Sequence, residues 1–170
     1  LSDTTWAAYN RWPDLWSLYD DGTPPHNWYT GPGVRVSFDR PYGKYRQILD
    51  APLSQGSGEF LLWEFPLAFW MEKHGYDVSY CSNSDVHDDP HCLTRAKAFL
   101  SVGHDEYWSA NQRANVEAAR DAGVNLGFFS GNQMFWKTRW ENSTDGSNTP
   151  YRTLVTYKET HANAKIDPNA

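Results

Sequence analysis

The feature that most constrains the fold is a strand–helix–strand pattern in the second half of the chain. The segment "AKAFLSVG", residues 96–103, is too apolar to face water on either side, which predicts a buried strand. Residues 109–123 predict an amphipathic helix, with Ser109 and Gln112 as a capping box at its start. A second apolar strand is predicted at 124–131. Strands joined in this way run parallel through a right-handed crossover, so the pattern predicts an α/β fold.

Other segments extend this arrangement. Residues 34–38, 76–81 and 151–157 each predict a strand, because apolar and polar residues alternate or β-branched residues gather there. The apolar segment 60–75 predicts a buried helix, and the polar segment 82–91 predicts a loop. Strands that alternate with helices and loops are typical of a doubly wound, mainly parallel sheet with helices on both faces.

A group of ionisable and polar side chains follows the first buried strand, in the segment "GHDEYW". His104, Glu106 and Tyr107 are of types that act as acids, bases or metal ligands. Asp105 and Glu106 have an alternative interpretation, because carboxylates at a helix entry accept backbone N–H bonds and favour the helix dipole. The loops 82–87 and 130–136 follow neighbouring predicted strands. Because ligands gather at the carboxyl ends of parallel strands, we expect the three loops to converge on one rim. The rim residues expected to bind a substrate are Ser130, Asn132 and Trp136.

Composition excludes some partners and leaves others open. The formal net charge is -6 and there is no basic run, which argues against a nucleic-acid partner. No apolar stretch reaches the length of about 18 residues that predicts a transmembrane helix. The chain contains nine Trp, ten Tyr and eight Phe, which either fill a large core or form a surface that stacks on sugars. The segment "DVHDDPH", 85–91, is either a metal-binding loop or an ordinary polar loop. Cys81 and Cys92 are too few for a disulfide scaffold, and the sequence leaves open whether they form a bridge.

The chain resembles a known family over nearly its whole length. The segments that carry the resemblance are "TTWAAYN", "SFDRPY", "WEFPLAFWMEKHGYDVSY", "FLSVGHDEYWSANQRANVEAARDAGVNLGFFSGNQMFWKTRWE" and "TPYRTLVTYKET". They are similar to the C-terminal domain of the N,N-dimethylformamidase large (beta) subunit family. The resemblance implies a three-layer α/β/α sandwich like that of class I glutamine amidotransferases. It also implies hydrolysis of a small tertiary formamide to formate and dimethylamine.

The same resemblance implies a mononuclear iron held by two tyrosines and a glutamate. It suggests Tyr107 as one tyrosine ligand and Glu159 as the glutamate. The second tyrosine is expected in the segment "WEFP", where this chain has Phe65, which offers no oxygen. Phenolate oxygens suit a trivalent iron, which would polarise an amide carbonyl and activate a water. His104 and Glu106 would then move protons.

Two functions therefore remain open for the sequence. The first is an amidohydrolase-like domain that acts on a small amide, with iron as its cofactor. The second is a non-catalytic domain of a larger, extracellular protein, which binds a carbohydrate or another partner; Phe65 and the many aromatic residues favour it. In both cases residues 1–170 form one domain of a larger chain, because "LSDTTW" reads as the tail of a strand. Further domains or subunits are then expected as partners, and neither nucleic acid nor a membrane is.

Overall fold

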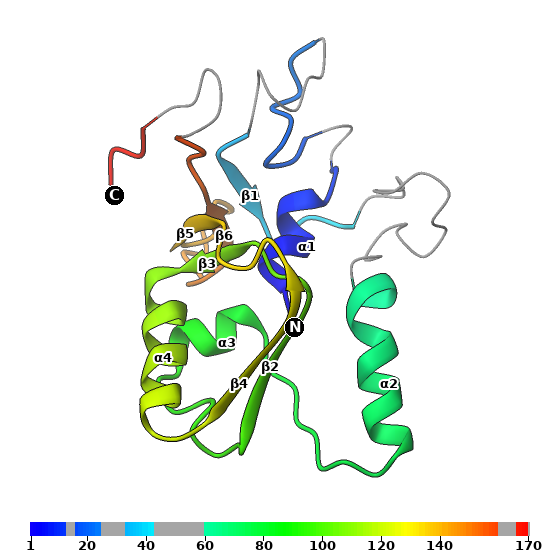
Figure 1. Ribbon diagram of the computed structural model, residues 1–170. Helices are drawn as coiled ribbons and strands as arrows, with labels where there is room; N and C mark the ends of the chain where they lie inside the picture. Colours follow the sequence, from blue (N-terminus) through cyan, green and yellow to red (C-terminus); the bar gives the residue numbers. More distant parts are fainter. Residues whose placement is uncertain (13–15, 25–32, 43–59, 160–165, 170) are drawn as a thin grey trace.

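The computed structural model describes residues 1–12, 16–24, 33–42, 60–159 and 166–169, which form a mixed α/β arrangement with two sheets (Figure 1). Its helices are α1 (Asp3–Tyr9), α2 (Phe65–Lys73), α3 (Asn83–Asp88) and α4 (Ala110–Asp121), with a π-helical turn η2 (Phe60–Glu64) directly before α2. Its strands are β1 (Arg35–Ser37), β2 (Ala98–His104), β3 (Tyr107–Ser109), β4 (Asn125–Gly131), β5 (Trp136–Glu141) and β6 (Thr153–Val155).

The predicted strand–helix–strand unit is present. β2 and β4 pair in parallel, from Ala98 opposite Asn125 to His104 opposite Gly131, and α4 connects them through β3. The side chain of Ser109 caps α4 by accepting a hydrogen bond from the Gln112 N–H at 3.0 Å, but the Gln112 side chain does not complete the predicted capping box. In Figure 1, α3 and α4 lie on one side of the β2–β4 pair and α2 lies on the other. The core between the pair and its helices consists of Val86, Leu93, Trp108, Val116, Ala119 and Val124.

The second sheet differs from the expected single, mainly parallel sheet. Its strand order is β1-β6-β5-β3, and of these pairs β3–β5 is parallel while β5–β6 and β1–β6 are antiparallel. The strand expected at 151–157 is therefore β6, a short antiparallel strand, and the one expected at 34–38 is β1. The core of this sheet consists of Ala7, Ala8, Leu18, Tyr19, Val36, Tyr107, Trp136 and Leu154.

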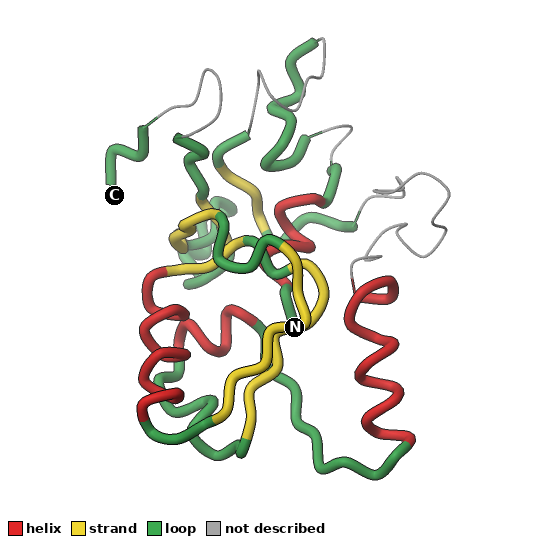
Figure 2. Tube along the Cα trace, viewed as in Figure 1, coloured by secondary structure: helices red, strands yellow, loops and turns green. Residues whose placement is uncertain are grey.

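Three predictions of secondary structure were wrong. Residues 76–81 form an irregular segment, drawn as loop in Figure 2, because Tyr76 stacks on Trp70 and Tyr80 donates to Glu72 at 2.6 Å. These aromatic side chains pack back on α2 instead of on a neighbouring strand. The segment 82–91 contains a helix, α3, which begins at a capping box formed by Ser82 and Asp85. The first residues belong to α1 and not to a strand.

The apolar segment 60–75 is helical as predicted, but its apolar residues are not buried. None of the α2 residues is buried, and Phe69 and Trp70 are 54% and 47% exposed. Only η2 approaches a sheet closely. Gly103 permits this approach, since a Cβ at Gly103 would lie 2.7 Å from the Cβ of Trp63, and the φ of Gly103 is +86°. This contact brings the turn that carries Glu64 against the end of β2.

Two smaller points concern the cysteines and the membrane. Cys81 and Cys92 are both free thiols, and both pack against the core beneath α3 and α4. Within the described part of the chain, the helices are too short or too polar to cross a membrane.

Candidate functional site

The carboxylate of Glu106 is the centre of a buried polar cluster. Glu106 lies in the turn between β2 and β3 and is 4% exposed. Its Oε2 accepts a hydrogen bond from the Tyr9 hydroxyl at 2.9 Å, and both of its oxygens lie within 3.0 Å of the Tyr19 hydroxyl. The Glu106 backbone is fixed as well, since its N–H donates to Thr5 Oγ1 at 3.0 Å. The end of α1 and the turn near Leu18 thus bring two phenols to one carboxylate.

The two phenols also contact each other. The Tyr19 hydroxyl donates to the Tyr9 oxygen at 2.7 Å, so three oxygens from distant parts of the sequence are mutual neighbours. Burial raises the pKa of both tyrosines far above the usual value, and the negative charge of Glu106 raises it further. Without a cation both phenols therefore keep their protons. We call Tyr9, Tyr19 and Glu106 the tyrosine–glutamate cluster.

His104 and Asn132 form the more accessible side of this cluster. The His104 Nε2 atom lies 3.2 Å from Glu106 Oε2 and 3.2 Å from the Asn132 side-chain amide. The His104 side chain is 23% exposed, so it connects the buried carboxylate with solvent. Asn132 has a φ of +51°, a left-handed conformation that asparagine tolerates better than most residues. The loop after β4 therefore meets the loop after β2, as expected for the carboxyl ends of parallel neighbours.

A buried lysine lies behind the cluster. Lys158 is 1% exposed, and its Nζ donates to the Leu18 carbonyl at 2.9 Å. The same nitrogen lies 3.4 Å from the centre of the Tyr19 ring, 5.3 Å from that of Tyr107 and 5.6 Å from that of Trp136. Burial lowers the pKa of Lys158 to about 7, while the charge of Glu106 acts in the opposite direction. Lys158 thus places a positive charge, or a neutral amine that is easily protonated, against the face of a cluster tyrosine.

The other residues expected at the rim lie around the cluster in different ways. Tyr107 is fully buried, and its hydroxyl faces that of Tyr19 without a hydrogen bond of good geometry. Burial raises the pKa of Tyr107 well above its usual value. Trp136 is buried beside Lys158, so it is a core residue, not an exposed surface for a substrate. The Ser130 hydroxyl lies 3.3 Å from that of Ser101, whose proton goes to Asp105.

Two of the positions suggested for iron ligands do not join Tyr107. Glu159 is exposed and lines a different pocket together with Tyr157, whereas Lys158 between them points inward. Phe65 is 44% exposed, and its ring packs against Phe60 and Phe69. Phe65 therefore lies outside the tyrosine–glutamate cluster, and its lack of a hydroxyl removes no oxygen donor from that cluster. Sequence reasoning missed Tyr9, Tyr19 and Lys158.

Asp105 has a structural role, but its partners are side chains and not the backbone N–H groups of a helix entry, as the alternative interpretation expected. Its carboxylate is 3% exposed and accepts hydrogen bonds from Asn83 Nδ2 at 2.7 Å and from Ser101 Oγ at 2.6 Å. Asn83 also donates to Thr4 Oγ1 at 2.8 Å. These bonds join the first turn of α3, strand β2 and helix α1. Asp105 thus holds together the elements that position the cluster.

Glu64 is a second buried carboxylate near the end of β2. Its Oε1 accepts hydrogen bonds from the Ser2 N–H at 3.0 Å, from the Ser2 hydroxyl and from Trp6 Nε1 at 3.1 Å. Its Oε2 is buried and has no partner among the described residues. Burial raises the pKa of Glu64. The bonds to Ser2 and Trp6 fasten η2 to the start of α1, whose end supplies Tyr9.

The segment "DVHDDPH" does not assemble a metal site. Asp85 caps α3, and His87 Nδ1 lies 2.7 Å from the Ser109 hydroxyl. Across the described ranges, no three side chains drawn from His, Cys, Asp and Glu are arranged to hold a metal ion. Phenol oxygens are outside that set, so the tyrosine–glutamate cluster remains a candidate.

Comparison with known proteins supports the resemblance seen in the sequence. The family described as N,N-dimethylformamidase beta subunit-like, C-terminal, matches residues 1–170, the whole chain. No curated protein matches the chain.

Proposed function

The chain belongs to the N,N-dimethylformamidase beta subunit-like, C-terminal family, and we propose that it hydrolyses a small amide at the tyrosine–glutamate cluster, with iron as cofactor. The observation that carries this proposal is the meeting of two tyrosine hydroxyls with one glutamate carboxylate at 2.9–3.0 Å. Two tyrosines and a glutamate are the ligands that the family resemblance implies. Tyr9, Tyr19 and Glu106 offer this set of ligands, so neither the position of Phe65 nor Glu159 is needed.

The chemistry of the donors fits a trivalent iron. Two phenolates and a carboxylate are hard oxygen ligands whose three negative charges balance an Fe³⁺ ion. The Tyr9 and Tyr19 oxygens are 2.7 Å apart, so few movements are needed for both to reach one ion. Because burial raises the pKa of both phenols, iron must displace two protons when it binds. We therefore expect iron affinity to rise with pH.

The residues around the cluster have separate roles in the proposed reaction. Bound iron would act as a Lewis acid toward the amide carbonyl. His104, next to Glu106 and partly exposed, is placed to take a proton from a water molecule and to give it to the departing amine. The Asn132 amide lies 3.2 Å from His104 Nε2 and orients either this ring or the substrate. Ser130 lies next to Gly131 at the end of β4 and lines the approach in this proposal.

The finer expectation about the fold is part of the proposal. A parallel β2–β4 pair with helices on both sides supports a three-layer sandwich related to class I glutamine amidotransferases. The cluster lies at the carboxyl end of β2, where such folds bind their ligands. We propose that residues 1–170 form one domain and that further domains or subunits of the parent protein complete the substrate pocket.

Iron loading tests the proposal. The purified protein is loaded with iron in air and freed of excess metal, and its visible spectrum and iron content are recorded. We expect one iron per chain and a colour from phenolate-to-iron charge transfer. We also expect release of formate and dimethylamine from N,N-dimethylformamide. Tyr9→Phe and Tyr19→Phe should each shift or remove the colour and lower the iron content, because each deletes one donor.

Tyr107→Phe is the matched control. It removes a phenol that lies beside Tyr19 but is not among the hydrogen-bond donors to Glu106. The variant should keep both colour and iron. Loss of colour in Tyr107→Phe, with no change in Tyr9→Phe and Tyr19→Phe, would show that Tyr107 is the ligand. A wild-type protein that stays colourless and metal-free would refute the iron site.

A second candidate function rests on exposed aromatic rings. Trp70 and Tyr76 are 47% and 57% exposed and stack with ring centres 5.5 Å apart. Such rings form platforms for sugars, which supports the non-catalytic, carbohydrate-binding alternative. If the protein lacks metal and hydrolytic activity, and if Trp70→Ala abolishes retention on a polysaccharide column, this alternative replaces the first.

A further inference from the structure

A second pocket, which shares no lining residue with the tyrosine–glutamate cluster, lies where α4 begins beside β5. Its volume is about 320 Å³, which lies within the range of small-molecule sites. Its wall includes His87, Ser109, Thr138, Trp140, Tyr151 and Tyr157. The proposed amide hydrolysis uses none of these residues.

The hydroxyl of Thr138 is the most informative group in this pocket. Thr138 is 3% exposed, and its Oγ1 is buried without a hydrogen-bond partner among the described residues. Thr138 is the register partner of Ser109 in the parallel β3–β5 pair, and Trp140 follows two residues later. Because side chains alternate along a strand, Thr138 and Trp140 point to the same face, the face that meets Ser109 and His87. A buried hydroxyl without a partner is costly, and a rotation of the Thr138 side chain toward a ligand in the pocket would supply one.

His87 offers a second donor. The Ser109 hydroxyl accepts a bond from the Gln112 N–H, so its own proton is free to go to His87 Nδ1, 2.7 Å away. Burial lowers the pKa of His87, so the ring is neutral and then carries its proton on Nε2. No described residue accepts from this Nε2–H. The pocket therefore presents the Thr138 hydroxyl and the His87 N–H as unused donors.

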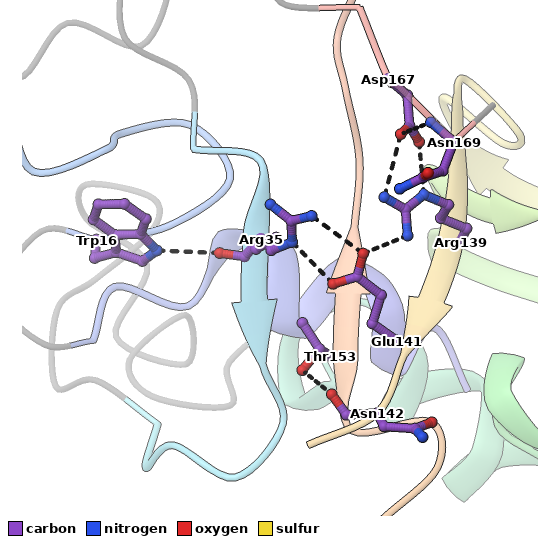
Figure 3. A network of polar contacts seen from close by, with 8 residues as sticks. All are labelled: Trp16, Arg35, Arg139, Glu141, Asn142, Thr153, Asp167 and Asn169. Carbon is purple, nitrogen blue, oxygen red and sulfur yellow. Dashed lines mark hydrogen bonds and ion pairs between the residues drawn. The ribbon is translucent and has the colours of Figure 1, made fainter. Parts of the chain in front are cut away.

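Positive groups near these donors can hold an anion, although the carboxylate of Asp88 faces both His87 and Tyr151. Ala110 and Asn111 belong to the first turn of the twelve-residue helix α4, where N–H groups lack partners within the helix and the dipole is positive. Lys137 adds a positive charge at the rim. Of the acidic residues in the wall, Asp167 is bound by Arg139 at 2.7 Å, and Arg139 also contacts Glu141 (Figure 3). Glu159 is exposed to solvent.

The remaining wall is aromatic. The ring of Tyr151 lies edge-on to that of His87 at 5.3 Å and to that of Trp140 at 6.2 Å, and Tyr157 lines the same space. Flat aromatic walls bind flat, apolar groups. We propose that this pocket binds a small carboxylate that carries a planar ring, with the carboxylate at Thr138, His87 and the start of α4, and the ring against Trp140 and Tyr151.

Benzoate is the probe that tests this assignment. Its binding to the protein is followed by tryptophan fluorescence and by titration calorimetry. We expect saturable binding, with acetate and benzyl alcohol each at least about tenfold weaker, because one lacks the ring and the other the charge. Thr138→Val, which keeps the shape and deletes the hydroxyl, should weaken benzoate about tenfold. In the absence of benzoate the same variant should melt at a higher temperature, since it removes an unpaired buried hydroxyl.

Two results separate this pocket from the proposed amidohydrolase site. Glu106→Gln should bind benzoate as the unchanged protein does, and Thr138→Val should keep its iron content. Equal affinity for benzoate and benzyl alcohol, or unchanged benzoate affinity in Thr138→Val, would overturn the carboxylate site. Loss of benzoate binding in Glu106→Gln would assign the ligand to the tyrosine–glutamate cluster instead. Failure of iron loading would leave the benzoate result unaffected.

Discussion

Asp105 and Glu106 are adjacent carboxylates, equally buried, in surroundings of opposite character. Asp105 is 3% exposed and Glu106 is 4% exposed. Asp105 accepts from an amide and a serine hydroxyl, groups that do not titrate in water at ordinary pH. Glu106 is surrounded by two phenols and a histidine, all of which can lose or gain a proton. Burial alone therefore does not distinguish a structural carboxylate from a functional one, whereas the chemistry of its partners does.

The largest expected effect is on the Glu106 side of this comparison. Glu106→Gln keeps the size of the side chain but removes the charge that an iron ligand needs. We expect loss of bound iron and a fall in amide hydrolysis of at least about a hundredfold. Elemental analysis measures the bound iron, and the release of dimethylamine measures amide hydrolysis. Full iron content in Glu106→Gln would show that the cluster is not the metal site.

The matched change on the other side should affect stability instead. Asp105→Asn replaces an acceptor oxygen with an amide that must face the donating Asn83 or Ser101. We expect the free energy of unfolding to fall by about 3 kcal/mol, as for other buried charge-assisted hydrogen bonds. Urea denaturation measures this loss. At temperatures where the variant is folded, its iron content per chain should equal that of the unchanged protein, and a metal-free folded variant would contradict the comparison.

Lys158, which lies beside the Glu106 cluster, should make the free energy of unfolding depend on pH. Its pKa is about 7 in the folded protein and returns to about 10.5 on unfolding, so between these values the unfolded chain binds more protons. The free energy of unfolding of the metal-free protein should therefore rise with pH, by about 2 kcal/mol between pH 7 and pH 8.5.

Lys158→Met tests this dependence. The variant should be more stable than the unchanged protein near pH 7 and should lose the rise, as measured by urea denaturation at both pH values. Lys137→Met, at an exposed position of β5, is the control and should retain the rise. An unchanged rise in Lys158→Met would show that other groups cause it.

The smallest expected effect concerns a single neutral donor to Asp105. Ser101→Ala removes the hydrogen bond of 2.6 Å to Asp105 Oδ2 but leaves the one from Asn83. We expect a loss of about 1.5 kcal/mol in the free energy of unfolding, half of that for Asp105→Asn. A double-mutant cycle with Asp105→Asn should then show coupling between the two positions. Additive losses would mean that Ser101 and Asp105 act independently.

Local patterns in the sequence were sufficient for the elements that depend on close neighbours. The β2–α4–β4 unit follows from two apolar segments and an amphipathic helix between them. The predicted parallel direction of its two strands was confirmed. The convergence of His104 and Asn132 follows from this unit, since both come after parallel neighbouring strands. The short strands β3 and β5 and the helix α3 were not found, because three to six residues carry too little periodic signal.

The partners of Glu106 were decided by tertiary structure alone. Tyr9 and Tyr19 lie 97 and 87 positions before Glu106, and no spacing or motif in the sequence links them to it. Lys158 had no local signal either, because the apolar residues Val155 and Tyr157 interrupt any two-residue alternation before it. Sequence reasoning identified the histidine and the carboxylate, since a strand end concentrates polar groups next to it in the chain. It could not identify the phenols, because what brings them there is the packing of α1 and the turn at Leu18 against the second sheet.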